Sequence, residues 1–214
     1  MSRATWAVVV ARTGRTAKTR LAPVLTPGQR AALALAMLDD LLAACGDAGL
    51  AMIAVVDTLD GQRLVERRGA CGLLDDGTDM NRAVRAGAAH ALAAGADSLV
   101  ILPGDLPDAG PDDLRALAAA GAPARAVVVA PDRAGAGTNG LLLRPPDVIA
   151  TAFGPGSAAR HLALGRAAGA DVARLFRPGL ARDVDRPDDL AALVGASTGR
   201  ATAAALARLH VRPP

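Results

Sequence analysis

Short apolar runs alternate with amphipathic segments along the whole chain. Four runs have the length and aliphatic composition of strands buried on both faces, and they occupy residues 6–10, 52–56, 98–102 and 126–130. Three weaker segments also have strand-like composition, at residues 73–74, 140–143 and 172–175. The pattern therefore predicts a sheet whose main strands are covered by other elements on both sides.

Apolar residues at intervals of three and four predict helices between these strands. The clearest helix begins at a capping box, Thr26-Pro27-Gly28-Gln29, and ends near Gly46. Further helices are predicted at residues 79–94, 111–120, 157–168, 187–194 and 201–209. Strands that alternate with helices are typical of βαβ units, so we expect an α/β fold with a largely parallel sheet and one domain over residues 1–214.

Composition excludes several classes of protein. Hydrophobic residues make up 51% of the chain, but no apolar run approaches the ~18–20 residues of a membrane span. The first apolar run is too short for a signal peptide. The two cysteines and three histidines are scattered, with no spacing typical of a zinc site. We therefore expect a cytoplasmic protein with no membrane partner, as a monomer or homodimer.

Basic and acidic residues are nearly balanced, at 24 against 21, with a formal net charge of +3. Aromatic residues are 1% of the chain, too few to build a platform on which bases stack. Nucleic acid is therefore disfavoured as a partner. Lys18 is the only lysine among many arginines, which suggests that a compact ammonium group is needed at that position.

The segment after the first strand, residues 11–23, is rich in cations. It contains Arg12, Lys18 and Arg20, and Gly14 lies between them. Glycine lets the backbone wrap around a phosphate, while arginine and lysine supply charge-assisted donors. Neither the Walker pattern nor the dinucleotide-binding glycine pattern is present. We interpret this basic loop as a binding site for a nucleoside triphosphate, with a solvated basic loop as the alternative.

Two acidic features are candidate metal ligands. Asp105 comes directly after the strand at 98–102, a position suited to holding Mg²⁺ on nucleotide phosphates. Asp183 and Asp185 alternate in an extended segment, so either side chain can face a metal. Asp185 also precedes a predicted helix, and we therefore favour Asp183 as the ligand and Asp185 as a cap or a supporting group. Ordinary turn chemistry is the alternative for Asp105.

Two glycine-rich loops are candidate anion sites. Residues 133–140 offer backbone amides and the hydroxyl of Thr138, and residues 153–161 place Ser157 at a predicted helix N-terminus. Taken singly, each loop is equally well explained as a flexible turn. A histidine such as His161 is more often structural than catalytic. The presence of both loops together with the basic loop favours an anion-binding role.

In their order and spacing these residues resemble the guanylyltransferases of coenzyme F420 biosynthesis, which have the nucleotidyltransferase fold. The resemblance covers most of the chain, through short motifs at residues 17–23, 79–81, 104–107, 137–138, 153–161 and 183–187. It implies a three-layer α/β sandwich of Rossmann-like type, with a mostly parallel twisted sheet flanked by helices. Each motif is only moderately specific when taken alone.

The resemblance also implies an activity. Members of this family transfer GMP from GTP to a small phosphorylated carboxylic acid and release pyrophosphate. We expect phosphoenolpyruvate as the acceptor, with 2-phospho-L-lactate or 3-phosphoglycerate as alternatives. Mg²⁺ is the implied cofactor, held by Asp105 and Asp183.

Residue roles follow from the same motifs. Lys18 and Arg20 are expected along the GTP phosphates as catalytic groups. The implied nucleotide-binding set adds four positions: Arg12, Gly14, Asn81 and Asp105. The implied acceptor-binding residues are Thr138, Gly154 and Ser157.

Other functions remain compatible with the residues alone. One alternative is a nucleotidyltransferase that acts on a sugar phosphate or a molybdenum pterin. The first loop of such enzymes usually contains more glycine than residues 12–20 of this chain, which argues against this alternative. A glycosyltransferase normally carries its metal-binding acidic pair after a central strand, where this chain has Gly104-Asp105-Leu106-Pro107. A non-catalytic nucleotide-binding module would bind GTP without releasing pyrophosphate.

Overall fold

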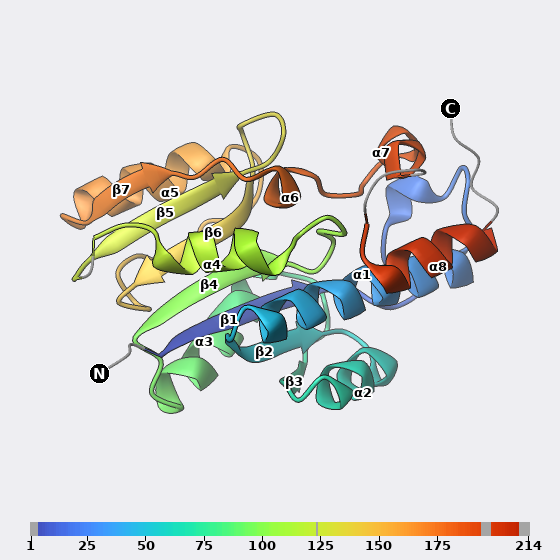
Figure 1. Cartoon of the computed structure of the whole chain (residues 1–214), viewed down its shortest axis with the longest axis horizontal. Coiled ribbons are helices and arrows are strands. Elements are labelled where there is room, and N and C mark those ends of the chain that lie inside the picture. The colour runs from blue at the N-terminus through green and yellow to red at the C-terminus, as the bar shows by residue number, and fades with distance from the viewer. Residues whose placement is uncertain (1–3, 123, 194–197, 210–214) are drawn as a thin grey trace.

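Seven strands form one twisted sheet at the centre of the molecule (Figure 1). The computed structural model describes residues 4–122, 124–193 and 198–209. The strands are β1 (Thr5–Ala11), β2 (Ala51–Val56), β3 (Cys71–Leu74), β4 (Ser98–Pro103), β5 (Ala126–Pro131), β6 (Thr138–Arg144) and β7 (Asp171–Arg174). Their order across the sheet is β3-β2-β1-β4-β6-β5-β7.

The sheet is parallel except at one strand. β1 pairs in parallel with β2 and β4, β2 with β3, and β5 with β7. β6 runs antiparallel to both of its neighbours, β4 and β5. The loop at residues 132–137 explains this reversal, because it is too short for the crossover that a parallel neighbour requires. The antiparallel direction brings the start of β6 to the edge where β4 ends.

Helices cover both faces of the sheet and make the expected three layers. One face carries α1 (Pro27–Asp47), α2 (Leu59–Arg67), α4 (Pro111–Ala119) and α6 (Pro178–Ala181). The other face carries α3 (Met80–Ala93) and α5 (Ser157–Ala167). Two further helices follow near the end of the chain: α8 (Arg200–Leu209) packs against α1, as Figure 1 shows, whereas α7 (Pro187–Leu193) lies next to the segment that contains Leu21. Within the described ranges, none of the helices has both the length and the apolarity to cross a bilayer.

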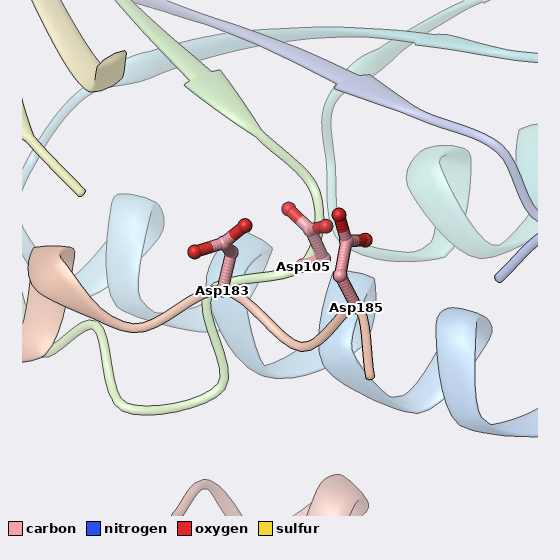
Figure 2. Close-up of side chains that lie close together, drawn as sticks. All are labelled: Asp105, Asp183 and Asp185. Carbon is pink, nitrogen blue, oxygen red and sulfur yellow. The ribbon is translucent and has the colours of Figure 1, made fainter. Parts of the chain in front are cut away.

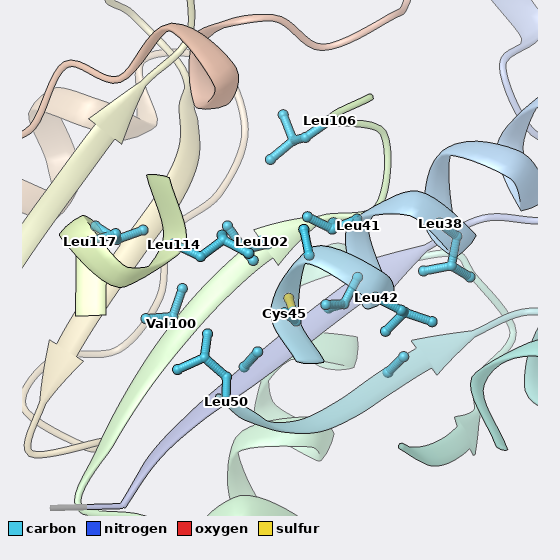
Figure 3. Close-up of a cluster of buried hydrophobic side chains, with 14 of the residues drawn as sticks. Leu38, Leu41, Leu42, Cys45, Leu50, Val100, Leu102, Leu106, Leu114 and Leu117 are labelled. Atoms are coloured by element: carbon cyan, nitrogen blue, oxygen red, sulfur yellow. The ribbon is translucent and has the colours of Figure 1, made fainter. Parts of the chain in front are cut away.

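Alternate residues of each strand feed the two main cores. Val9 faces the core beneath α1 and α4, whereas its neighbour Val8 faces the core beneath α3 and α5. Figure 3 shows the first of these cores, where Leu41 and Cys45 of α1 lie above the strands. Burial raises the pKa of the Cys45 thiol to about 12, so this residue acts as an inert apolar side chain.

A third, smaller cluster, which we call the satellite core, joins distant parts of the chain. Leu21, at the end of the basic loop, packs there with Leu33 of α1 and with Val184. α7 and α8 close it with three leucines: Leu190, Leu193 and Leu206. The short helix η1 (Thr19–Leu21) presents Leu21 to this cluster. The basic loop and the segment around Val184 are therefore held in one packed unit.

Within the described residues, the sequence pattern predicted every strand of the sheet but missed two α-helices and the short 3₁₀ helix η1. α2 was missed because its sequence is polar, and only Gly61 and Val65 of the helix are buried. The available signal was Thr58, whose hydroxyl accepts a hydrogen bond from the Gly61 N–H at 3.1 Å as an N-cap. α6 is a single turn, too short for periodicity to reveal. Val194, the last residue of one predicted helix, lies outside the described residues.

The N-terminus of α8 is held by a side chain from α1. The two carboxylate oxygens of Asp40 accept hydrogen bonds from the backbone N–H groups of Ala201 and Thr202, at 2.9 and 2.7 Å. Gly199 permits this contact, because a Cβ atom at that position would collide with the Asp40 carboxylate. One carboxylate thus satisfies two of the unpaired N–H donors at the start of α8.

Asp40→Ala is expected to lower the free energy of unfolding by about 1–3 kcal/mol, because two charge-assisted hydrogen bonds at a helix N-terminus are lost. Hydrogen exchange should accelerate in α8. The matched control is Asp39→Ala in the same helix, whose partly exposed ion pair with Arg68 should contribute under about 1 kcal/mol. Equal losses in the two variants would contradict the capping role.

Candidate active site

A cavity of about 380 Å³ opens at the carboxyl ends of β1, β2 and β4. Its walls come from the basic loop, from the loops after these strands and from the start of α3. Arg12, Lys18, Arg20 and Asp105 all line it. Open α/β sheets bind ligands at this edge, and the volume suits a small molecule. We take this cavity as one end of the candidate site.

Three carboxylates meet at one side of the cavity. One oxygen each of Asp105, Asp183 and Asp185 lies within 4.8 Å of the others. In Figure 2 all three side chains rise toward the ends of the strands, Asp105 from the loop after β4 and the other two from the segment before α7. The expected meeting of Asp105 with Asp183 is therefore present in the structure.

Asp105 is placed by a close approach of two strand ends. The N–H of Gly104 donates to the carbonyl of Val10 at 2.9 Å, and a Cβ atom at Gly104 would collide with the side chain of Ala11. Only glycine allows this approach. Oδ2 of Asp105 pairs with the Lys18 ammonium, while Oδ1 is buried with no hydrogen-bond partner among the described residues. A buried carboxylate oxygen without a partner is costly, which favours a missing cation or donor.

Lys18 lies between the basic loop and the carboxylates. Its backbone is left-handed, with φ of 51°, a conformation that costs a non-glycine residue about 1–2 kcal/mol. Its Nζ atom contacts Asp105 and lies 3.1 Å from Asp185. Burial alone would lower the pKa of Lys18, but these carboxylates outweigh it and raise the pKa. The ammonium therefore stays charged at neutral pH and is not a proton acceptor.

The two aspartates of the acidic segment are in different electrostatic environments. Burial, with the negative charge of Asp105, raises the pKa of Asp183. Burial also opposes ionisation of Asp185, but Lys18 and Arg20 prevail and lower its pKa. Arg20 donates to Asp185 at 2.8 Å. Asp183 has only the amide of Asn139 as a side-chain partner, at 3.4 Å, and lacks a cation among the described residues.

These residues fit a divalent cation. Three carboxylates face two cationic side chains, Lys18 and Arg20, so the cluster retains negative charge. Carboxylate oxygens are the ligands that hard cations such as Mg²⁺ prefer. A cation would supply a partner for Oδ1 of Asp105, which has none among the described residues, and for the Asp183 carboxylate, whose hydrogen bond from Asn139 is long.

One interpretation of the sequence was that Asp185 caps the helix that follows it, but its side chain does not cap α7. Asp189 of α7 holds the start of this helix instead, because its carboxylate accepts from the N–H groups of Asp185 and Arg186 at 3.1 and 2.8 Å. The side chain of Asp185 faces Lys18 and Arg20. It thereby anchors the basic loop to the acidic segment.

Two residues that the sequence analysis did not select hold the basic loop. Arg30 of α1 is buried and donates to the backbone carbonyls of Arg15, Ala17 and Leu25 at 3.0–3.1 Å. Asp57, after β2, accepts from the N–H groups of Thr13 and Gly14 at 2.6 and 3.2 Å. A single arginine in an otherwise apolar helix face was the available signal for Arg30.

Gly14 and Asn81 are not among the described residues that line the cavity. The N–H of Gly14 is used by Asp57. The side-chain amide of Asn81 clamps the backbone of Phe153, accepting from its N–H at 2.8 Å and donating to its carbonyl at 3.3 Å. Nucleotide contacts by these two residues stay predictions, and Asn81 has a second role as a tether of the loop that contains Gly154.

The predicted acceptor residues gather at the start of β6 and α5. Ser157 Oγ donates to Thr138 Oγ1 at 3.0 Å, and both side chains are buried. Gly154, in the loop before Ser157, has φ of 122°, a conformation that favours glycine. Arg160 folds over this loop and donates to the carbonyls of Ala152 and Pro155. β6 pairs with β4, so this group lies at the same edge of the sheet as Asp105.

Sequence comparisons point to one family. The family model described as "Guanylyl transferase CofC like" matches residues 6–212. The chain is 44% identical over 193 residues to the phosphoenolpyruvate guanylyltransferase of Sphaerobacter thermophilus, covering 89% of this chain and 93% of that protein. The Rubrobacter xylanophilus protein of the same name is 43% identical, with 88% and 92% covered. A 3-phospho-D-glycerate guanylyltransferase of Phenylobacterium zucineum is 35% identical, with 96% and 97% covered.

Solved structures share the fold. A protein of Desulfovibrio desulfuricans G20, assigned as a nucleotide-diphospho-sugar transferase, superposes with a TM-score of 0.75 at 17% identity, covering 97% of this chain and 95% of that one. A 4-diphosphocytidyl-2C-methyl-D-erythritol synthase gives 0.61 at 13% identity, with 90% and 98% covered. The manganese complex of Rv0371C from Mycobacterium tuberculosis gives 0.56 at 22% identity, with 90% and 100% covered. The architecture is thus of the nucleotidyltransferase type.

Arg30→Met should destabilise the protein by about 2–4 kcal/mol, because two backbone carbonyls of the basic loop and the carbonyl of Leu25 lose their buried donor. Hydrogen exchange should accelerate over residues 15–25 more than elsewhere. Arg63→Met is the matched control, since Arg63 is exposed and its one ion pair among the described residues is a 3.5 Å contact with Asp60. A uniform increase in exchange along the chain would argue against a local role for Arg30.

Stability should fall as the pH is lowered from 6.5 to 4, in part through His161. Burial, and then the positive charge of Arg160, lowers the pKa of His161 from 6.5 to about 4. The unfolded chain therefore takes up a proton in this window that the folded chain does not, which favours unfolding by at most about 3 kcal/mol. Denaturant unfolding at several pH values should give a shallower decline for His161→Asn. Parallel declines would contradict the assignment.

Proposed function

This chain belongs to the CofC-like family of guanylyl transferases, and we propose that it transfers GMP from GTP to phosphoenolpyruvate with release of pyrophosphate. The observation that carries the proposal is the meeting of the cationic basic loop with a cluster of three carboxylates, two of which, Asp105 and Asp185, line the cavity. An anionic nucleotide and a divalent cation are the ligands that such a pairing fits. Both proposed substrates are small soluble molecules, in keeping with a cytoplasmic location.

The cavity is assigned to GTP. Arg12 and Arg20 line it and supply guanidinium groups to the phosphates, and Lys18 adds a fixed positive charge. The Arg20 side chain is 66% exposed, so it is free to turn from Asp185 toward a bound triphosphate. Lys18 and Arg20 would neutralise the charge that develops on the leaving pyrophosphate.

Mg²⁺ is assigned to Asp105 and Asp183, where it would neutralise charge between the two anionic substrates. Asp185 supports this pair by holding Lys18 and Arg20. The amide of Asn139 orients Asp183. The pKa of Asp183 is raised by burial and by the charge of Asp105, so a neighbouring cation would favour its ionised form.

The acceptor is assigned to the group formed by Thr138, Gly154 and Ser157. A phosphate oxygen of the acceptor attacks the α-phosphorus of GTP, and the bond from that phosphorus to the bridging oxygen breaks. Its electron pair leaves with pyrophosphate. A phosphate monoester is already anionic near neutral pH, so no proton has to be removed from the nucleophile. Catalysis then rests on positioning and charge neutralisation.

The first test is release of pyrophosphate from GTP in the presence of Mg²⁺ and phosphoenolpyruvate. Asp105→Asn should lower the rate at least about 100-fold and weaken Mn²⁺ binding followed by electron paramagnetic resonance. Asp112→Asn is the control, because this carboxylate is 85% exposed and, in the part of the chain that the structure describes, its one ion pair is with Arg115. Full turnover by the Asp105→Asn variant would remove Asp105 from the metal site.

A second measurement identifies the acceptor. Phosphoenolpyruvate, 2-phospho-L-lactate and 3-phosphoglycerate are offered together with GTP, and the products are separated by mass spectrometry. We expect the guanylylated phosphoenolpyruvate to predominate. A predominant product from either competitor would change the assigned acceptor. Binding of GTP with no product from any of the three would favour a non-catalytic nucleotide-binding module.

A further inference from the structure

A histidine that the proposed reaction does not use lies directly behind the acceptor residues. His161 is fully buried in α5, one turn after Ser157. Its Nδ1 atom lies 3.1 Å from Thr138 Oγ1, and its Nε2 atom lies 2.9 Å from the backbone nitrogen of Ala152. We propose that His161 is a positioning residue that fixes the Thr138 hydroxyl as a hydrogen-bond donor toward the phosphorylated acceptor. This inference rests on the proposed function for the identity of the acceptor.

The backbone decides which ring nitrogen carries the proton. The N–H of Ala152 can only donate, so Nε2 of His161 must accept and carries no hydrogen. A neutral imidazole then has its single proton on Nδ1, which faces Thr138. In a protonated ring, the Nε2–H group of His161 would face the backbone N–H of Ala152, and two donors would repel each other. The pKa of His161, lowered to about 4 by burial and by Arg160, agrees with a neutral ring.

The Thr138 hydroxyl is left with one direction for its own proton. Its oxygen accepts from Nδ1–H of His161 and from the hydroxyl of Ser157 at 3.0 Å. A hydroxyl has two acceptor sites and one donor, so both acceptor sites are occupied. No further protein partner of this hydroxyl occurs among the described residues. The proton of Thr138 is therefore the part of the network that remains for a ligand.

Such an arrangement suits an anionic acceptor oxygen. The donor is held in direction before the substrate binds, so no hydroxyl rotation is needed at that moment. His161 itself is held in orientation by the edge of Phe153, with ring centroids 4.9 Å apart at an angle of 69°. Asn81 in turn holds the backbone of Phe153. The direction of one hydroxyl thus depends on contacts from β6, α5 and α3.

Two substitutions separate positioning of the hydroxyl from simple tethering of the loop. In His161→Asn, the side-chain amide nitrogen replaces Nδ1 and keeps the donor to Thr138. In His161→Gln, the longer amide reaches the place of Nε2 and keeps the acceptor for Ala152, but loses the donor to Thr138. We expect the Gln variant to raise the KM for phosphoenolpyruvate about tenfold and the Asn variant to leave this KM close to the wild-type value. The KM for GTP should be unchanged in both variants. The reverse order, or equal effects, would overturn the proposal.

A double-mutant cycle tests whether His161 acts through Thr138. Thr138→Val keeps the shape of the side chain and removes the hydroxyl. In that background His161→Gln should raise the acceptor KM by less than about twofold, because the group it positions is already absent. Independent, multiplying effects of the two substitutions would show that His161 acts by another route.

A spectroscopic measurement keeps the inference testable if the proposed activity fails. Long-range ¹H–¹⁵N correlation spectra report which ring nitrogen of a histidine carries the proton, and comparison with His161→Asn assigns the signal. We expect Nδ1 protonation with a neutral ring down to about pH 5. A proton on Nε2, or a charged ring at pH 7, would refute the network itself. Absence of pyrophosphate release from the wild-type protein would instead refute the proposed function. The spectrum would still test which ring nitrogen of His161 carries the proton.

Discussion

Three carboxylates gathered at one point repel one another, and the fold has to hold them there against that repulsion. Apolar packing supplies most of the restraint. Val184 lies between Asp183 and Asp185 in the sequence and is fully buried in the satellite core, so both flanking aspartates are kept at the surface of that core. Asp105 is held separately by the close approach of β4 to β1. Lys18 reduces the repulsion by pairing with two of the three.

The satellite core also joins the cationic side of the site to the acidic side. Leu21 follows Arg20 directly and packs in the same cluster as Val184, so the cations and the carboxylates are carried by one unit. Arg30 attaches the rest of the basic loop to α1. The cluster is completed by α7 and α8, which lie near the end of the chain. Substitutions in the satellite core should therefore affect stability and chemistry together.

Strands and most helices followed from local patterns, whereas several roles within the site did not. The aliphatic runs identified the main strands because a strand buried on both faces needs apolar residues throughout. Asp105 was selected because a carboxylate at a strand end suits a cation, and Asp183 because alternate side chains of an extended segment share a face. α2 was missed because its sequence is polar overall and only two of its residues, Gly61 and Val65, are buried. The contacts of His161 with Thr138 and of Asn81 with Phe153 did not follow from the sequence, since these partners are distant along the chain.

The sequence by itself determined the α/β fold, the basic loop and the aspartates that can hold a cation. Each of these depends on neighbouring residues or on the rule that ligands bind beyond the carboxyl ends of parallel strands. Only the tertiary structure decided that Asp185 faces Lys18 and that His161 faces Thr138. Hydrogen-bond direction depends on which atoms meet across elements that are far apart in the chain. No local pattern of residue types carries that information.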